Sequence, residues 1–386
     1  MMLKNNATSA STAAAARGRS QLRCHAALAP FKGLAVQAAG GKFQPYEYEP
    51  KPLGPTEIEI KVTHNGLCHS DLHMRDDDWG ITSFPLIAGK GAGPPRHEVV
   101  GEVAAKGDTV AGIEVGDRVG YGWLRDSCRK CRYCLRGEEN LCLQQTPTIV
   151  GRSQQQCRTD VITGCSESLP AVAATPGLPL FVFAAGAFAY KIPDALGSAE
   201  AAPMLCAGIT VYAPLRKHTR RPGMSVAVLG VGGLGHLAVQ FAAAMGADVT
   251  ALVRDDDEAG EALALGAREA ATSARAFEEK KGSYDVVLNC ASARLDFAKV
   301  LGLLCPDGVL IQVGIPGGGA EITLPLQDVV FSQKSLAGSI EMLEFAVAKG
   351  VKPMIETYKL SQINEAAARV ASGRARYRVV METDEI

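Results

Sequence analysis

The sequence has no excess of charge of either sign. Its 386 residues contain 40 lysines and arginines against 41 aspartates and glutamates, so the formal net charge is -1. Binding a nucleic acid or an anionic membrane through the general surface requires a basic excess. We therefore expect no nucleic-acid partner. The 47% of apolar residues also exclude a disordered chain.

Long uninterrupted apolar runs are also missing. A helix needs about 20 predominantly apolar residues to span a membrane. The uncharged stretches 168–190 and 222–247 are long enough, but prolines interrupt the first and four glycines divide the second. We therefore predict no membrane-spanning helix and no membrane partner.

Acidic residues are absent from the first 46 positions, which hold six lysines and arginines and are rich in alanine, serine and threonine. Such a start is typical of an organelle transit peptide. We predict that residues 1–26 are a chloroplast transit peptide, because the small and hydroxylated residues outweigh arginine. Mitochondrial targeting, or a disordered tail on a cytoplasmic protein, are the alternatives.

Cysteine is too sparse for a disulfide scaffold, since the chain has only 11. Four of them nevertheless lie within 15 residues, at Cys128, Cys131, Cys134 and Cys142. Tight clustering in a chain of this length favours a metal over disulfides. Four thiolates would form a closed tetrahedral zinc site with no open position for chemistry, so we predict a structural zinc. An iron–sulfur cluster and free thiols are the alternatives.

Hydrophobic patterns divide the chain into two parts. From 31 to 119, short alternating segments such as 57–62 predict an all-β region. After 195, apolar strands alternate with helical segments, which predicts a doubly wound parallel sheet. The segment 376–382 is predicted to be a strand that returns to the first domain.

A glycine-rich loop follows the predicted strand 225–229 and opens the predicted helix 236–245. Gly230, Gly232 and Gly235 fit the pattern G-x-G-x-x-G, with Gly233 and Leu234 inside it. In this context the glycines permit a tight turn, the approach of a pyrophosphate and close packing of helix on strand. The loop is therefore predicted to bind a dinucleotide at the N-terminus of the helix.

The choice between NAD(H) and NADP(H) depends on the end of the next predicted strand, 249–253. Arg254 favours NADP(H), because a base there binds a 2′-phosphate. Asp255 favours NAD(H), because an acid binds the ribose 2′-hydroxyl. The residues alone leave both cofactors open.

A dispersed set of Cys68, His97 and Cys206 is a second metal candidate. Two thiolates and an imidazole can hold zinc and leave one position open for water or substrate. The wide spacing carries little weight by itself, because a lone buried cysteine is more often a small core residue.

Several segments match one family in order and spacing: 66–73 (GLCHSDLH), 97–101 (HEVVG), 119–123 (VGYGW), 127–142, 202–212 (APMLCAGITVY), 230–236 and 312–316 (QVGIP). From about Leu34 onward the chain resembles the zinc-dependent medium-chain alcohol dehydrogenases, specifically the cinnamyl-alcohol-dehydrogenase-like aldehyde reductases. The resemblance implies an α/β fold with a GroES-like β-barrel catalytic domain over 27–194, completed by 340–386. A Rossmann domain would occupy 195–339, and the active site would lie in the cleft between the two domains.

The resemblance also implies roles for the matching residues. Cys68, His97 and Cys206 would bind a catalytic zinc, with Glu98 beside them as an occasional ligand, so the chain would hold two zinc ions. Ser70 would pass a proton toward His73. Asp71 would orient the metal ligands, and the cofactor would meet His69, Thr210, Val313, Gly314 and the glycine loop. Trp79 and Trp123 would line the substrate pocket, although core packing is an equal alternative for Trp79.

The implied activity is hydride transfer between NADP(H), preferred over NAD(H), and a primary, cinnamyl-like alcohol or aldehyde, in a homodimer. Three places depart from the family: an insertion at 90–96, the stretch 143–186, and a missing loop after Ile340. These departures motivate two alternatives, a catalytically impaired nucleotide- and zinc-binding homologue and an error in the gene model. A zinc-free quinone reductase of the same superfamily is disfavoured by the two cysteines and the histidine.

Overall fold

The computed structural model describes residues 31–48, 53–82, 84–87, 97–148, 181–316, 322–337 and 348–384. The predicted transit peptide and the 90–96 insertion lie outside these ranges. So do most of the stretch 143–186 and the chain directly after Ile340. The predictions made for these segments remain predictions.

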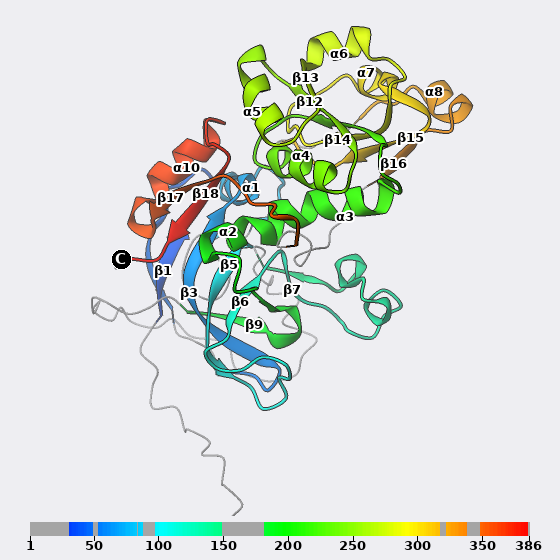
Figure 1. The fold of residues 1–386 in the computed structure, drawn as a ribbon. Coiled ribbons are helices and arrows are strands. Elements are labelled where there is room, and N and C mark those ends of the chain that lie inside the picture. Colours follow the sequence, from blue (N-terminus) through cyan, green and yellow to red (C-terminus); the bar gives the residue numbers. More distant parts are fainter. Residues whose placement is uncertain are drawn as a thin grey trace, which may run out of the picture.

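The first part of the chain folds around a seven-stranded sheet (Figure 1). Its strands run in the order β10 (Tyr190–Lys191), β6 (Arg118–Tyr121), β5 (Val99–Lys106), β3 (Glu57–Leu67), β18 (Arg378–Glu382) and β17 (Ile355–Lys359), and β9 (Phe181–Ala185) also pairs with β3. A smaller sheet consists of β2 (Gln44–Tyr48), β1 (Phe31–Val36) and β4 (Leu86–Ile87). The antiparallel pairing of β18 with β3 confirms that the C-terminal strand returns to the first sheet.

A helix interrupts the region that we predicted to be all-β. Helix α1 (His69–Asp76) begins directly after β3 and buries Leu72 and Met74 against the core of the first sheet. The prediction was wrong here because the helix is short and polar, so that only its cap marks it in the sequence. Cys68 is the N-cap, and the carboxylate of Asp71 accepts its backbone N–H. An acid three residues after the N-cap is half of a capping box, and it marks a helix start.

Helices also connect the two sheets. Helix α2 (Ser198–Pro203) buries Ala201 and Ala202 against Val100 of β5 and Val380 of β18. A π-helical turn, Met204–Gly208, leads from α2 into α3 (Ile209–His218), which packs on the second sheet through Val211. In Figure 1 these helices lie between the two sheets. The turn between them therefore sits where the two halves of the molecule meet.

The second part is a six-stranded parallel sheet in the order β13 (Glu269–Thr272), β12 (Asp248–Val253), β11 (Ser225–Leu229), β14 (Tyr284–Asn289), β15 (Leu304–Gln312) and β16 (Ser335–Ala337). Helices α4 (Gly235–Ala244) and α5 (Ala259–Ala264) bury side chains on one face, and α6 (Ser273–Glu279) and α7 (Phe297–Gly302) on the other. This is the predicted doubly wound sheet. Helix α8 (Leu326–Phe331) precedes the edge strand β16, and α10 (Ile363–Ala371) packs on the first sheet.

Strand β11 pairs with β12 on one side and with β14 on the other. From β11 the chain first builds the sheet outward through β12 and then crosses back to add β14 on the opposite side, so the strand order reverses beside β11. In open α/β sheets, ligands bind at such a switch point, beyond the carboxyl ends of the strands. None of the helices within the described ranges is long and apolar enough to cross a membrane.

Candidate functional site

A cavity of about 960 Å³ opens at the switch point and is lined by both domains. Most of the site residues predicted from the sequence line it. They are Cys68, His69, Ser70, His73, Trp79, Trp123, Cys206, Thr210, Gly230, Gly232, Gly233, Leu234, Arg254, Val313 and Gly314. His97, Glu98 and Gly235 do not line the cavity, because each lies fully behind its wall.

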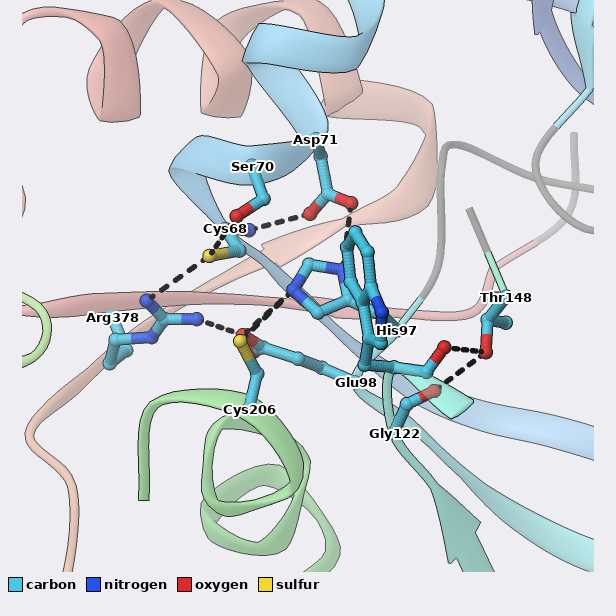
Figure 2. Close-up of polar contacts among 10 residues, drawn as sticks. Cys68, Ser70, Asp71, His97, Glu98, Gly122, Thr148, Cys206 and Arg378 are labelled. Atoms are coloured by element: carbon cyan, nitrogen blue, oxygen red, sulfur yellow. Dashed lines mark hydrogen bonds and ion pairs between the residues drawn. The ribbon is translucent and has the colours of Figure 1, made fainter. Parts of the chain in front are cut away.

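The dispersed metal candidates converge at one wall of this cavity (Figure 2). Cys68 directly follows β3, His97 and Glu98 precede β5, and Cys206 lies in the π-helical turn after α2. One ligand atom from each of the four residues lies within 4.8 Å of the others. The Nε2 atom of His97 is 3.1 Å from the Sγ atom of Cys206, although 109 residues separate them.

The buried carboxylate of Asp71 holds two of these residues in place. Its Oδ2 atom accepts the backbone N–H of Cys68 at 2.7 Å, and its Oδ1 atom is 3.1 Å from Nδ1 of His97. Burial lowers the pKa of His97, but the charge and hydrogen bond of Asp71, together with those of Cys68, outweigh it and raise the pKa well above its ordinary value. With Nδ1 directed at Asp71, the Nε2 atom is turned toward the thiols, which is the usual support for a metal-binding histidine.

The pKa values of the two thiols are shifted in opposite directions, downward for Cys68 and upward for Cys206. A hydrogen bond from Cys206 lowers the pKa of Cys68, against the opposing effect of burial, and the charge of Arg378 lowers it further. Because a metal binds thiolate rather than thiol, a site that favours one thiolate already is prepared for a cation. The donor set of two sulfurs and one imidazole nitrogen matches an open zinc site.

Sequence reasoning missed Arg378, which lies beside Cys68 and Cys206 (Figure 2) and lines the same cavity. Its side chain is 6% exposed, its Nη2 atom forms an ion pair with Oε1 of Glu98, and its Nη1 atom is 3.8 Å from Sγ of Cys68. Burial raises the pKa of Glu98 to about 7, against the lowering effect of Arg378. An arginine opening the apolar strand 378–382 was the signal that could have found it.

The Oε2 atom of Glu98 is buried and has no hydrogen-bond partner among the described residues. An unpaired buried carboxylate oxygen is costly. A cation beside Glu98 would satisfy this atom, so the residues present fit a metal ion at this position.

The four clustered cysteines form a separate lobe beside the strand pair β7 (Leu124–Asp126) and β8 (Thr146–Pro147). The Sγ atom of Cys134 is 3.5 Å from that of Cys131 and 3.9 Å from that of Cys128, and the Sγ atoms of all four lie within 4.8 Å of one another. Zinc–sulfur bonds of about 2.3 Å in a tetrahedron place the sulfurs about 3.8 Å apart. The lobe therefore has the geometry of a four-thiolate zinc site.

Backbone N–H groups support this lobe. Cys131 donates its N–H to the sulfur of Cys128 at 3.3 Å, and Gln144 donates to the sulfur of Cys142 at 3.4 Å. Donors from Lys130 and Cys131 lower the pKa of Cys128 to about 6. Stabilised thiolates are what a metal site requires. All eight cysteines within the described ranges are free of disulfides.

The glycine loop has the local structure predicted for a pyrophosphate site. Gly230 has a φ of +87°, and its N–H donates to the carbonyl of Leu252 at 3.0 Å. A Cβ atom at Gly235 would collide with the carbonyl oxygen of Gly230, so this glycine lets α4 pack on β11. A Cβ atom at Gly232 would meet nothing within 4 Å. The space in front of Gly232 is therefore open to a ligand, which the fit of a dinucleotide requires.

His73 and Ser70 lie on α1 at the cavity wall. The Nδ1 atom of His73 is 2.6 Å from Oδ2 of Asp78, and the Oγ atom of Ser70 is 3.7 Å from Sγ of Cys68. Asp78 was not predicted from the sequence. A carboxylate can only accept in this contact, so Nδ1 of His73 carries the hydrogen.

The two tryptophans contact the predicted functional histidines. The ring of Trp79 lies 5.1 Å from that of His73, and the ring of Trp123 packs edge-on against His97 at 5.9 Å. Both are partly buried and also pack against the hydrophobic core of the first sheet. They thus line the cavity and contribute to the core at once.

A further buried residue links the glycine loop to the first domain. His236 follows Gly235 directly, is fully buried, and stacks on the ring of Tyr377 at 4.8 Å with an angle of 16°. Its Nδ1 atom is 3.0 Å from the carbonyl oxygen of Gly232, and its Nε2 atom accepts the N–H of Met354 at 3.3 Å. These contacts hold Met354 and Tyr377 against the glycine loop.

Comparisons with known proteins agree with this architecture. Residues 54–174 match the alcohol dehydrogenase GroES-like domain, and residues 233–357 match the zinc-binding dehydrogenase domain. The chain is 38% identical over 360 residues to aldehyde reductase AdhA of Synechocystis sp., covering 91% of this chain and 98% of that protein. It is 38% identical over 344 residues to NADP-dependent alcohol dehydrogenase C 1 of Mycolicibacterium smegmatis, covering 86% and 92%.

Among solved structures, a cinnamyl alcohol dehydrogenase from Sorghum bicolor superposes with a TM-score of 0.80 at 32% identity, covering 92% of this chain and 98% of that chain. The chain belongs to the zinc-binding alcohol dehydrogenase family. It is an oxidoreductase of the alcohol dehydrogenase type, with a GroES-like domain and a Rossmann domain, as the sequence motifs predicted.

Proposed function

We propose that the chain is a zinc-dependent aldehyde reductase and alcohol dehydrogenase that prefers NADP(H) and acts on primary, cinnamyl-like alcohols and aldehydes. One observation carries the proposal. Cys68, His97 and Cys206 come from three distant segments and bring their ligand atoms together at the wall of the cavity that the glycine loop also lines. Core thiols and a core histidine have no need to meet beside a cofactor loop.

The metal would be held by Cys68, His97 and Cys206, with Glu98 behind them. When bound, zinc supplies Lewis-acid chemistry that polarises a carbonyl oxygen and lowers the pKa of an alcohol. Asp71 keeps Nε2 of His97 directed at the ligand set, and Cys68, His97 and Glu98 are all buried.

Proton transfer falls to Ser70 and His73. The Oγ atom of Ser70 lies next to the metal ligands and can donate to the oxygen of the product alcohol or accept from it. The Nε2 atom of His73 exchanges the proton with solvent, since Asp78 occupies Nδ1. Both side chains line the same cavity, so the route does not cross the protein core.

The cofactor preference rests on three observations. Arg254 lines the cavity at the end of β12, where the family binds the adenosine ribose. The glycine loop offers the space at Gly232 and the N-terminus of α4 for a pyrophosphate. A 38% identical relative is named as NADP-dependent.

The substrate class rests on the shape and lining of the cavity. Trp123 packs against His97, Trp79 lies beside His73, and the lining of the same cavity also includes Phe188 and Leu124. An apolar and aromatic wall favours a substrate with a flat apolar body and a single polar end. The Sorghum relative is named as a cinnamyl alcohol dehydrogenase, which agrees with such a substrate.

The proposed homodimer rests on the edge strand of the second sheet, which has no further strand beside it among the described residues. Strand β16 ends the sheet, and exposed apolar side chains lie beside it: Leu326 at 71%, Val330 at 60%, Phe331 at 83% and Leu336 at 47% exposure. An exposed edge with apolar flanks favours pairing with a second copy. Light scattering should give a molar mass of two chains for the unmodified protein and of one chain for Phe331→Glu. A molar mass of one chain for the unmodified protein would refute the dimer.

Zinc content and turnover test the proposed function together. The purified chain should carry two zinc ions and oxidise NADPH faster than NADH over a panel of aldehydes. Cys206→Ala should lose one zinc and nearly all turnover while keeping its thermal unfolding transition. Cys305→Ala, a half-buried thiol outside the cavity, is the matched control. One zinc and no turnover in the unmodified chain would instead support the catalytically impaired homologue.

A further inference from the structure

The adenosine end of the cavity contains an acid as well as a base. Register places Leu252 of β12 opposite Leu229 of β11, so Arg254 follows β12 at the level of the glycine loop. Both Arg254 and Glu258 line the cavity there, whereas Asp255 does not. The acid that faces a bound cofactor is therefore Glu258, which sequence reasoning did not consider.

Arg254 is held by two carboxylates. Its Nε atom is 2.8 Å from Oδ2 of Asp255, and its Nη2 atom is 2.8 Å from Oε1 of Glu258. The backbone N–H of Arg254 also donates to Oε2 of Glu258 at 3.3 Å. Glu258 thus binds this one residue through both carboxylate oxygens.

The two acids differ in their surroundings. The side chain of Glu258 is 16% exposed, while those of Asp255 and Arg254 are 62% and 74% exposed. An exposed ion pair is weakened by solvent, and a shielded carboxylate keeps more of its interaction. Glu258 is therefore the stronger of the two restraints on Arg254.

A 2′-phosphate would enter a negative environment at this position. Four acids, residues 255–258, follow Arg254 directly. A phosphate monoester carries a charge of about −1.5 to −2 at neutral pH. It must draw Arg254 away from Glu258 and lie beside that carboxylate. A free 2′-hydroxyl carries no charge, and a carboxylate can accept its hydrogen bond.

We propose that Glu258 determines cofactor specificity: its carboxylate competes with a 2′-phosphate for Arg254 and so reduces the preference for NADP(H) over NAD(H). The inference rests on the proposed function for the identity of the cofactor. It adds Glu258 as a determinant and states the sign of its effect. Neutralising Glu258 should strengthen binding of the 2′-phosphate, while binding of the remainder of the nucleotide should be unaffected or weaker.

Binding of nucleotide fragments tests this without turnover. Affinities for 2′,5′-ADP and 5′-AMP are measured by calorimetry on the full-length, zinc-loaded protein. Glu258→Gln should raise the ratio of the two affinities about three- to fivefold, mostly through tighter 2′,5′-ADP binding, as expected for one lost surface ion pair. Glutamine keeps an oxygen that accepts the N–H of Arg254, so the loop is preserved.

Asp257→Asn is the matched control. It removes the same charge one residue away, at a side chain that does not line the cavity. Its ratio of 2′,5′-ADP affinity to 5′-AMP affinity should change by less than half as much as that of Glu258→Gln. An equal change in both variants would mean that the general field of the acids acts, and would overturn the role of Glu258.

A double substitution tests the competition itself. In the Arg254→Gln background, Glu258→Gln should give no gain in 2′,5′-ADP affinity, because the released base is absent. A full gain in that background would also refute the proposal. The NADPH/NADH ratio of kcat/KM should follow the fragment ratio. Absence of aldehyde turnover in every variant would refute the proposed function instead, while the fragment affinities would still decide the role of Glu258.

Discussion

The buried imidazole of His236 should make stability fall steeply on mild acidification. Burial, together with the nearby charge of Arg378, lowers its pKa from 6.5 to about 3, against hydrogen bonding to the Gly232 carbonyl, which raises it. The neutral ring suits its partners: Nδ1–H donates to Gly232, and Nε2 accepts the N–H of Met354. Protonation would place a hydrogen on Nε2 that points at the Met354 N–H.

The size of the effect follows from linkage. Because the pKa is lower in the folded state, the stabilising contribution is complete above about pH 6.5 and is lost as the pH falls toward the folded value. Each pH unit in this window costs about 1.4 kcal/mol. Between pH 7.5 and 5.0 the folded state should lose about 2 kcal/mol through His236 alone.

The perturbation is His236→Asn, whose side-chain amide can still donate to the carbonyl of Gly232 but does not titrate. Denaturant unfolding at pH 7.5 and 5.0, at fixed protein and zinc concentrations, gives the pH-dependent loss for each protein. All other titrating groups, including the metal ligands, are common to both and cancel in the difference. The variant should lose about 2 kcal/mol less than the unmodified chain. Equal losses would refute the assignment of a buried neutral imidazole.

Three further predictions concern the metal sites and the glycine loop. Cys131→Ser should remove one zinc per chain by metal analysis and lower the thermal unfolding temperature; retained zinc would contradict a four-thiolate site. Gly232→Ala should keep the unfolding temperature but weaken 5′-AMP binding, since the added methyl enters open space, whereas Gly235→Ala should cost about 1–3 kcal/mol of stability by overpacking. Equal stability of the two alanine variants would argue against this division. Arg378→Met should cost about 3–5 kcal/mol in denaturant unfolding, because Glu98 is left buried without its ion pair. Adding Glu98→Gln should restore part of the loss, and a purely additive double variant would show that the pair is not coupled.

The features that the sequence predicted best are local ones. Cys128 to Cys142 form their lobe within 15 residues, and Gly230 to Gly235 form a loop between adjoining elements. Turn geometry, capping and metal-ligand spacing act between near neighbours, so the pattern of residues carries them. The same holds for the alternation of strands and helices after 195, from which the parallel sheet was predicted.

Helix α1 shows where a local signal was present and overlooked. Its eight residues are too short and too polar for a hydrophobic repeat, and the surrounding strands dominated the pattern. The acid at Asp71, three residues after Cys68, marked the helix start, and the same side chain supports His97. One residue thus serves both the helix and the site.

What the sequence determined alone is therefore the set of building elements: a cysteine lobe, a glycine loop, two kinds of sheet and a list of residues with suitable chemistry. Only the tertiary structure decided which of them meet. Cys206 reaches His97 across 109 residues, and Arg378 reaches Glu98 across 280, because β18 returns beside β3 and the turn after α2 lies between the sheets. Such contacts depend on packing between elements and not on spacing along the chain. The meeting of Cys206 with His97 was therefore implied only by the resemblance to a known family, and that of Arg378 with Glu98 was not predicted at all.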